Sequence, residues 1–368
     1  MQTFALTLDL GFGRKRSRGG EIYAGRASAS HRHGASRTLW MAASLLWILD
    51  AANNVTMEPY RAYVGDRLPR EQRALGFLTQ SAFTGLAQTL SYLSPTLLVL
   101  VGFNKDAVDA NGVPDITRIA FLIGAVLSVS TILWSVTRVP ELPPSPADRE
   151  GLAEPLTLEL ALRDLRTALV EMPRPMRQLA LAMLCQWYAM FAYWQFITFS
   201  LARTLHGTVD VHGVAFHDTV LTVGQLGAIY NAIAFLSALS LVPLARRWGA
   251  KRTHAVCLIA SGVAMLAIPA LSSFGALACA MIGIGIGWAG MMGNPYIMLT
   301  DMIPRGQNGI YMGIFNMFIV IPMMIESLTL PLLYDHLLFG DARNVIYLAA
   351  ALMFGGACAT LLVGRVRA

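Results

Sequence analysis

The chain has 368 residues, of which 55% are hydrophobic and 14% are charged, and its formal net charge is +6. This composition is too apolar and too weakly charged for an ordinary soluble domain, so it predicts a polytopic membrane protein in a lipid bilayer. The Lys and Arg residues fall in short loops between apolar runs, as the positive-inside rule describes, which argues against a nucleic-acid partner. The cysteines lie singly in apolar segments without nearby His, so neither disulfides nor a metal site is predicted.

Residues 1–38 are rich in Arg, Ser and Gly and contain no long apolar run. We expect them to form a disordered basic leader. A mis-assigned start or a transit peptide are two explanations for such a leader, and the absence of amphipathic periodicity favours the first.

Nine apolar segments follow, each near the roughly 20 residues that a membrane helix needs. They cover residues 39–57, 80–102, 117–136, 179–201, 220–243, 254–272, 275–298, 308–333 and 344–364. We therefore expect an all-α membrane protein in which residues 39–136 form three spans and residues 179–368 form six. Residues 137–178 join the two parts as a linker, and the helical spacing of apolar residues from Leu156 to Met172 predicts a surface helix within it.

The loops differ in charge, because the loops after the first, third and fifth segments are rich in Arg and the alternate loops are not. The positive-inside rule then places the Arg-rich loops and the C-terminus in the cytoplasm, and we expect a bacterial inner membrane. The same orientation leaves the basic residues 1–38 on the outside, against the rule. An odd number of spans and this misplaced charge both predict that spans are missing before Trp40.

An internal repeat supports this expectation. The segment from Pro59 to Gln72 resembles that from Pro295 to Gln307, since both contain Pro-Tyr and then Asp-x-(Leu/Ile)-Pro-Arg-x-Gln. Parallel repeats of this kind build many secondary transporters. Three spans of the second half precede the one that carries Pro295, but none precedes the one that carries Pro59, so we expect nine helices of an original twelve.

The first apolar segment carries an acid near its middle. Asp50 lies about 16 Å from Leu39 along a helix, close to the bilayer midplane. An ionisable residue inside a membrane is costly and indicates a functional site by default, with packing as the alternative. Asn54 and Arg61 follow on the same stripe of the helix. Arg61 is three turns from Asp50, so anchoring the interface or pairing with Glu58 are alternative roles for it.

This region resembles a known family. The motif from Trp47 to Asn54, followed by Pro59-Tyr-Arg61, is similar to the fourth transmembrane helix of the sucrose/proton symporters, in the glycoside–pentoside–hexuronide group of the major facilitator superfamily. The motif from Tyr311 to Pro322 resembles the eleventh helix of that family. Residues 40–364 correspond to helices four to twelve, so the resemblance covers most of the chain.

The resemblance implies an alternating-access carrier that couples sugar uptake to proton entry, with Asp50 as the proton-binding carboxylate and Arg61 as its electrostatic partner. The proton is then the coupling ion, and no other cofactor is expected. Two positions depart from the family pattern: Met57-Glu58 replaces a common Gln-Gly, and Met323 replaces a common Gln. These departures leave the identity of the sugar open.

Several other polar and aromatic residues are candidates for binding a sugar. Asn53 and Asn54 have amides that suit sugar hydroxyls, although Asn also joins membrane helices. In the fourth segment Gln186, Trp187 and Trp194 accompany Tyr188, Tyr193 and Gln195, with the interfacial aromatic belt as the alternative. Asn316 lies in the helix-eleven motif, whereas packing is the expected role of Asn231 and Asn294.

Three acids complete the candidates. Glu326 is an intramembrane acid that is either a second proton or ligand site or a helix-end carboxylate at the outer interface. Asp66 and Asp301, in the repeated loops, are expected to cap helices or to form gating ion pairs with nearby Arg residues. No nucleophile, metal or paired-carboxylate arrangement indicates an enzyme.

Taken together, these patterns predict a secondary transporter for proton-coupled symport of a disaccharide or glycoside. A facilitator-type exporter of other small molecules shares the same fold and is one alternative. A membrane protein that senses or binds sugar without transporting it is the other.

Overall fold

The computed structural model describes residues 48, 61, 63–64, 67–104, 107, 115–138, 157–211, 213–303 and 308–364. The chain divides into two units, residues 1–63 and 64–368. In the first unit only Ile48, Arg61 and Tyr63 are described, so the expected leader 1–38 and most of the expected span 39–57 lie outside the described residues. The second unit contains the elements that follow.

All regular secondary structure in the described residues is helical, as predicted. The helices are α3 (Arg70–Leu100), α4 (Asp115–Arg138), α6 (Leu158–Val170), α7 (Arg174–His206), α8 (Val214–Trp248), α9 (Ala250–Ala267) with a 3-10 turn η1 (Ile268–Ala270), α10 (Phe274–Thr300), α11 (Asn308–His336) and α12 (Ala342–Leu362). Eight of these helices overlap the eight apolar segments predicted after residue 57, and three of them, α3, α9 and α12, end before the segment does. The predicted linker helix is present as α6.

Six of these helices are long and apolar enough to cross a membrane, counted over the residues that the structure describes. They are α4, α8, α9, α10, α11 and α12. The other two long helices, α3 and α7, are too polar to meet that description, because α3 carries Gln, Ser and Thr along its length and α7 carries Gln, Trp and Tyr. The nine predicted spans are therefore not all established.

The helices extend beyond the apolar segments because hydropathy marks only the part of a helix that suits lipid. Helix α3 begins ten residues before the predicted span, directly after Pro69 at its N-cap. Helix α10 continues past Pro295 and ends at Thr300, two residues beyond the predicted segment 275–298, with Asp301 as its C-cap. A proline within a membrane helix is tolerated because neighbouring groups can take up the freed carbonyl.

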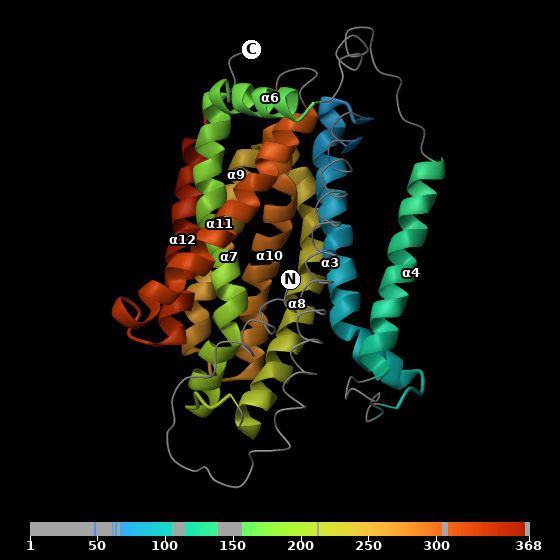
Figure 1. The fold of residues 1–368 in the computed structure, drawn as a ribbon. Coiled ribbons are helices and arrows are strands. Elements are labelled where there is room, and N and C mark those ends of the chain that lie inside the picture. The colour runs from blue at the N-terminus through green and yellow to red at the C-terminus, as the bar shows by residue number, and fades with distance from the viewer. Residues whose placement is uncertain are drawn as a thin grey trace, which may run out of the picture. The chain divides into compact units, whose positions relative to one another are not determined.

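Glycines in α10 allow the backbones of its neighbouring helices to approach closely. A Cβ atom added to Gly283 would lie 2.5 Å from the carbonyl oxygen of Ala260 in α9, and one added to Gly285 would lie 2.6 Å from that of Tyr230 in α8. Small residues allow such close approach of helix backbones in membrane proteins. Figure 1 shows α10 among α7, α8, α9 and α11. This position makes α10 the central helix around which the candidate site is built.

Helix α6 lies crosswise at one end of the other helices (Figure 1). The hydroxyl group of Tyr311, in the first turns of α11, donates a hydrogen bond to the Ala168 carbonyl at 3.4 Å. Ala168 is buried, whereas Leu165, Leu169 and Val170 are exposed. The linker helix is therefore attached to the bundle by one face and leaves an apolar edge free.

The turn between α11 and α12 is held by Asp341, the N-cap of α12. Its side chain accepts the Arg343 backbone N–H at 2.9 Å and pairs with the Arg343 guanidinium at 2.7 Å. Arg203 of α7 lies 3.7 Å from the same carboxylate and donates to the Gly340 carbonyl at 3.1 Å. The hydrogen bond from Arg343 is the main reason that the pKa of Asp341 is lowered from its usual range.

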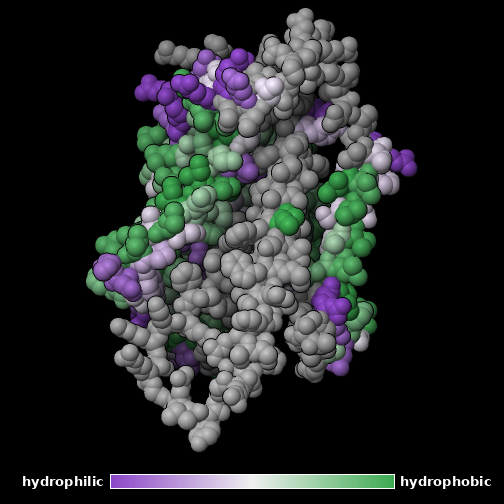
Figure 2. All heavy atoms as spheres, viewed as in Figure 1, coloured by the Kyte–Doolittle hydropathy of each residue, from purple (hydrophilic) through white to green (hydrophobic). Residues whose placement is uncertain are grey.

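The surface of α4 is apolar between two hydrophilic ends (Figure 2). No residue in its membrane-length segment, Arg118–Ser135, is buried within the protein. Exposed apolar side chains along it include Phe121, Leu127 and Leu133. Such a surface suits contact with lipid tails or with further membrane helices rather than with water.

Candidate functional site

Three adjacent pairs of residues on α7 organise the candidate site. Gln186 and Tyr193, Trp187 and Trp194, and Tyr188 and Gln195 are each seven residues apart, so each pair lies on one stripe of the helix, two turns apart. The three stripes point in different directions, and each meets a different set of neighbours.

The tryptophan stripe of α7 meets α10. The ring of Trp288 in α10 lies 6.0 Å from that of Trp187 and 5.2 Å from that of Trp194, both in edge-to-face geometry. The Trp288 indole nitrogen donates a hydrogen bond of 2.7 Å to the side-chain oxygen of Gln88 in α3. Three helices far apart in the sequence therefore meet at one aromatic cluster, which we define as Trp187, Trp194, Trp288 and Gln88.

Two indole N–H groups of this cluster do not donate a hydrogen bond to any described residue. That of Trp187 is buried and has no hydrogen-bond partner among the described residues. That of Trp194 lies near the hydroxyl group of Tyr230 in α8 but does not reach hydrogen-bond geometry with it. Buried donors without partners are costly, so a ligand or water that accepts from them would stabilise the site.

Tyrosines from three helices surround this region. The ring of Tyr92 in α3 lies against Gly227 of α8, where an added Cβ atom would be 2.9 Å from the tyrosine Cζ atom. The hydroxyl groups of Tyr92 and Tyr230 interact with each other. Tyr193 is buried, and its hydroxyl group lies 3.7 Å from the sulfur of Met281. These residues add hydroxyl groups and aromatic surface on the α3 and α8 sides.

Gln186 takes part in a different contact. Its side-chain oxygen lies 2.8 Å from the Nε2 atom of His254 in α9, and its amide nitrogen donates to the sulfur of Met183 at 3.0 Å. Gln186 and His254 are both fully buried. Both polar ends of Gln186 are thus engaged inside the protein, and the structure does not bring this predicted sugar ligand to the aromatic cluster.

The third stripe of α7 faces α11. The amide nitrogen of Gln195 donates to Oε2 of Glu326 at 2.9 Å, and the hydroxyl groups of Tyr188 and Thr329 lie 2.9 Å apart. Glu326 is fully buried and lies ten residues before the end of α11. This position is inside the helix rather than at its end.

The asparagines of the second half remain within their own helices. Asn231 donates to the Gly227 carbonyl one turn earlier at 2.9 Å, while Asn294 is fully buried with neither amide atom hydrogen-bonded among the described residues. Asn316 has a buried side-chain oxygen without a partner in the same part of the chain.

The end of α10 and the start of α3 meet at a cation. Arg73 donates to the Thr300 carbonyl at 3.2 Å, and its guanidinium lies 3.7 Å from the Asp301 carboxylate. Asp301 is also the C-cap of α10. The cation therefore lies at the negative end of the α10 dipole, where it stabilises the contact. We call the contact of Arg73 with Thr300 and Asp301 the α3–α10 latch.

The predicted proton site lies largely outside the described residues. Asp50, Asn53, Asn54 and Asp66 are all in this group. Arg61 is described and is buried, with 6% of its surface exposed. The structure therefore leaves the expected relation between Asp50 and Arg61 as a prediction.

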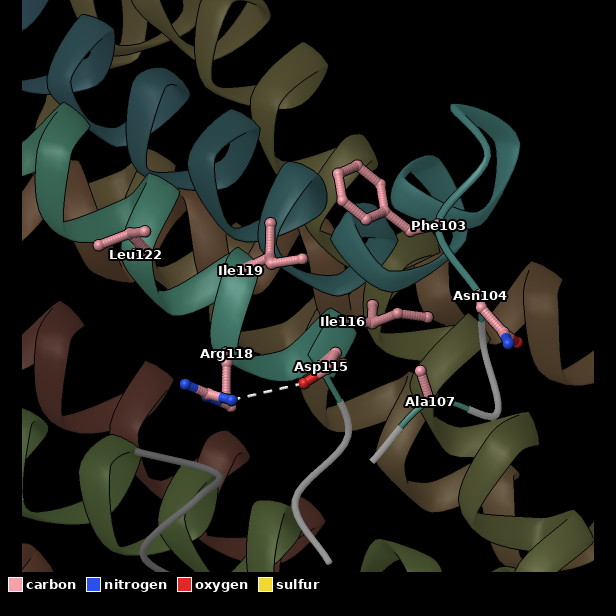
Figure 3. A pocket seen from close by; sticks show the side chains of 8 residues that line it. All are labelled: Phe103, Asn104, Ala107, Asp115, Ile116, Arg118, Ile119 and Leu122. Atoms are coloured by element: carbon pink, nitrogen blue, oxygen red, sulfur yellow. Dashed lines mark hydrogen bonds and ion pairs between the residues drawn. The ribbon is translucent and has the colours of Figure 1, made fainter. Parts of the chain in front are cut away.

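A pocket lies apart from the aromatic cluster, where α3 ends and α4 begins (Figure 3). Its wall includes Phe103 and Asn104 after α3 and Ile116, Ile119 and Leu122 on α4. Its ion pair joins Arg118 and Asp115 at 3.4 Å, and both side chains are substantially exposed. The aromatic surface of this open pocket is limited to the ring of Phe103, and its charged side chains are exposed, whereas the cluster on α7 and α10 combines several aromatic rings with buried polar groups.

Over the described part of the chain, no three His, Cys, Asp or Glu side chains gather in a way that could hold a metal ion. The cysteines Cys185, Cys257, Cys279 and Cys358 are free thiols. The chemistry that this arrangement offers is hydrogen bonding and aromatic contact.

Sequence reasoning missed part of this cluster. Trp288 and Gln88 were not among the predicted site residues, and neither were Tyr92 and Tyr230. Trp288 lies within a Gly-rich apolar run that resembles an ordinary membrane span. The glycines beside it indicate a close helix contact, but they do not indicate which residues the ring of Trp288 meets.

Comparison with known proteins agrees with this architecture. The family model described as Major Facilitator Superfamily matches residues 29–327 and 210–367. The chain is 27% identical to sucrose transport protein SUC4 of Arabidopsis thaliana, over 87% of this chain and 68% of that protein. It is 26% identical to sucrose transport protein SUT2 of Oryza sativa subsp. indica, over 87% of this chain and 69% of that protein. The helical architecture and the family match together show that the chain is a membrane protein of the major facilitator superfamily.

Proposed function

We propose that the protein is a secondary transporter that moves a disaccharide or glycoside together with a proton by alternating access. The observation that carries this proposal is the aromatic cluster, in which Trp187, Trp194 and Trp288 from α7 and α10 meet Gln88 from α3. The relatives named as sucrose transport proteins support a sugar as the substrate.

The chemistry of the cluster suits a sugar. A pyranose ring has apolar C–H faces and polar edges, so it binds best where aromatic rings and hydrogen-bonding groups lie together. The cluster offers indole rings, the Trp187 N–H group without a partner among the described residues and the Gln88 amide. Tyr92 and Tyr230 add hydroxyl groups beside it.

Proton coupling is assigned to Asp50, with Arg61 as its electrostatic partner and Asn54 as support. This assignment rests on the motif from Trp47 to Arg61 and on the cost of an acid near the bilayer midplane. An acid that binds a proton in one state and releases it in the other links the proton gradient to the direction of sugar movement. Asn53 and Asn316 are assigned supporting contacts.

The α3–α10 latch provides the conformational element. In the predicted domain organisation, α3 belongs to the N-terminal half and α10 to the C-terminal half, so Arg73 joins the two halves at one end of the bundle. The distribution of Lys and Arg among the loops supports a cytoplasmic location for this end and for the C-terminus. Opening the carrier to that side requires the contact to break.

The experiment is uptake of radiolabelled sucrose into proteoliposomes that contain the purified chain, with and without an inward proton gradient. We expect uptake above equilibrium in the wild-type protein, and loss of this gradient-driven accumulation in Asp50→Asn. The matched control is Asp115→Asn, which removes an exposed acid at the start of α4. Accumulation by Asp50→Asn at the wild-type level would remove Asp50 from the mechanism, and an absence of gradient-driven uptake in the wild type would overturn the proposed function.

A further inference from the structure

A second acid lies in the membrane-spanning part of the protein. Glu326 is on α11, within the membrane-length segment Ile310–His336. Its side chain is fully buried, and its Oε1 atom has no hydrogen-bond partner among the described residues. No ion pair joins it to a Lys, Arg or His in the same described residues.

The neighbours of Glu326 are neutral. Gln195 of α7 donates to Oε2 at 2.9 Å. The Ser327 hydroxyl group lies 3.5 Å from the same oxygen but also donates to the Met323 carbonyl at 3.0 Å, so its bond to Glu326 is the weaker one. One carboxyl oxygen is therefore satisfied by an amide, while the other is free to carry a proton.

The titratable groups near Glu326 come from the helices that pack against α11 and from α11 itself. From α7, Tyr188 is the titratable group that interacts with Glu326. The hydroxyl group of Thr329 donates to the Ile325 carbonyl at 2.6 Å. In the contact of 2.9 Å between Tyr188 and Thr329, the Tyr188 hydroxyl group is therefore the donor, and its proton is not directed at Glu326.

Helix α6 also packs against α11, but at a distance from the acid. The two helices meet at Tyr311, which is about 22 Å along the helix axis from Glu326. The cations Arg163 and Arg166 of α6 are therefore remote from the carboxyl group. On α11 itself, the nearest charged residue after Glu326 is Asp335, more than two turns away.

An ionised carboxylate in such surroundings is costly, because burial removes its hydration and no cation among the described residues replaces it. The neutral acid costs less, since its O–H group can donate and Gln195 still satisfies the second oxygen. From this geometry we infer that Glu326 is a second proton-binding site, located between α7 and α11 in the C-terminal half. The proton comes from water when the site is open to solvent, and the carboxyl group returns it when α7 and α11 next expose the site.

This inference is separate from the sugar. It requires an acid that takes up and releases a proton, whatever substrate the protein carries. The competing role for Glu326 is an ionised acceptor for a ligand hydroxyl group, and the experiment must separate the two.

The test is infrared spectroscopy of the purified full chain in detergent during a pH titration. A protonated carboxylic acid in a dry site gives a C=O stretching band that an ionised carboxylate lacks. We expect wild-type protein to show such a band at low and neutral pH, to lose it as the pH is raised, and to recover it when the pH is lowered again. The contribution of Glu326 to this band, seen as the difference between the two spectra, should be absent from Glu326→Gln, whose amide has nearly the same shape and can accept the Gln195 hydrogen bond.

Two further variants make the assignment specific. Glu71→Gln removes an exposed acid from the first turn of α3 and should leave the band unchanged. Gln195→Leu removes a hydrogen bond that stabilises the charged form, so the band should persist to higher pH by about one pH unit.

The possible spectra distinguish a proton-binding Glu326 from one that stays ionised. A band that is present in wild type, reversible with pH and absent from Glu326→Gln supports the proton site. Spectra of wild type and Glu326→Gln that are identical in this region at every pH would overturn it, since they indicate an acid that stays ionised and serves as an acceptor. A band that never responds to pH would also overturn it. Because no transport is required, a chain that fails to move sucrose would overturn the proposed function and leave this site standing.

Discussion

The α3–α10 latch gives the most direct access to the conformational cycle. Arg73 connects the start of α3 to the end of α10 through the Thr300 carbonyl and the Asp301 carboxylate. Arg73→Gln removes the charge and shortens the side chain while leaving it polar. We expect this change to shift the protein toward the form in which the two helix ends are apart.

The magnitude follows from the two contacts. A hydrogen bond to a charged donor contributes about 1.5 kcal/mol or somewhat more when it is buried. The side chain of Arg73 is 24% exposed and that of Asp301 is 41% exposed, so solvent screens the ion pair, which adds only a few tenths of a kcal/mol. A loss of about 1–2 kcal/mol changes the ratio of closed to open forms by a factor of about 5–30.

The assay is a distance measurement between spin labels on Glu71→Cys in α3 and Ile303→Cys after α10, in a background where the four native cysteines are replaced. Wild type should show mainly the short distance, and Arg73→Gln should show a larger long-distance fraction. Asp301→Asn keeps the hydrogen bond to Thr300, so its shift should be smaller. Arg118→Gln is the matched control, because the Arg118–Asp115 pair lies within α4.

An unchanged distance distribution in Arg73→Gln would refute this reasoning, since it would mean that the latch does not hold the two helices together. A shift of equal size in Arg118→Gln would also refute it, because a general loss of surface charge would then account for the result.

Two further predictions concern stability. Gly283→Ala places a Cβ atom 2.5 Å from the Ala260 carbonyl oxygen, so we expect a loss of about 1–3 kcal/mol and a lower unfolding temperature; Gly275→Ala in the same helix, where a Cβ meets nothing within 4 Å, should be neutral or stabilising. The pKa of Asp341 is lowered in the folded state, mainly by the hydrogen bond from Arg343, so its contribution to stability is complete above the ordinary aspartate value of about 4 and is lost as the pH falls through the lower folded value. Thermal unfolding of wild type and Asp341→Asn at several pH values should therefore show a wild-type advantage at neutral pH that disappears in acid, and an advantage that persists in acid would contradict this assignment.

Much of the fold could be predicted from the sequence because lipid imposes a simple constraint on composition. Each span after residue 57 appeared as an apolar run, and each is a helix in the structure. The ends of the helices could not be predicted in the same way. Helix α3 continues through Arg70 to Arg73 because the helical backbone satisfies its own hydrogen bonds in water as well as in lipid, and hydropathy does not detect this extension.

The candidate site was only partly predictable. Trp187 and Trp194 were identified from their clustering, and the structure brings both to one partner ring. Their partner Trp288 lies about one hundred residues further along the chain, and only helix packing reveals it. The contacts of Gln186 could not be predicted for the same reason. Its amide suggests a sugar ligand in the sequence, but in the structure this amide is hydrogen-bonded to His254.

The two helices that are too polar to qualify as spans carry the polar residues that meet at the site. Gln88 and Tyr92 come from α3, and Trp187 and Trp194 come from α7. The polar residues that lower the hydropathy of α3 and α7 are therefore the ones that contribute to the candidate site.

The proposed function requires that sugar and proton cross the membrane together. It is tested most directly by adding sucrose to a weakly buffered suspension of proteoliposomes that contain the chain and recording the external pH. We expect the external medium to become more alkaline as sucrose enters, and a protonophore to abolish sucrose accumulation. Sucrose entry without any change in external pH would contradict proton coupling, and an absence of sucrose entry would contradict sugar transport by this chain.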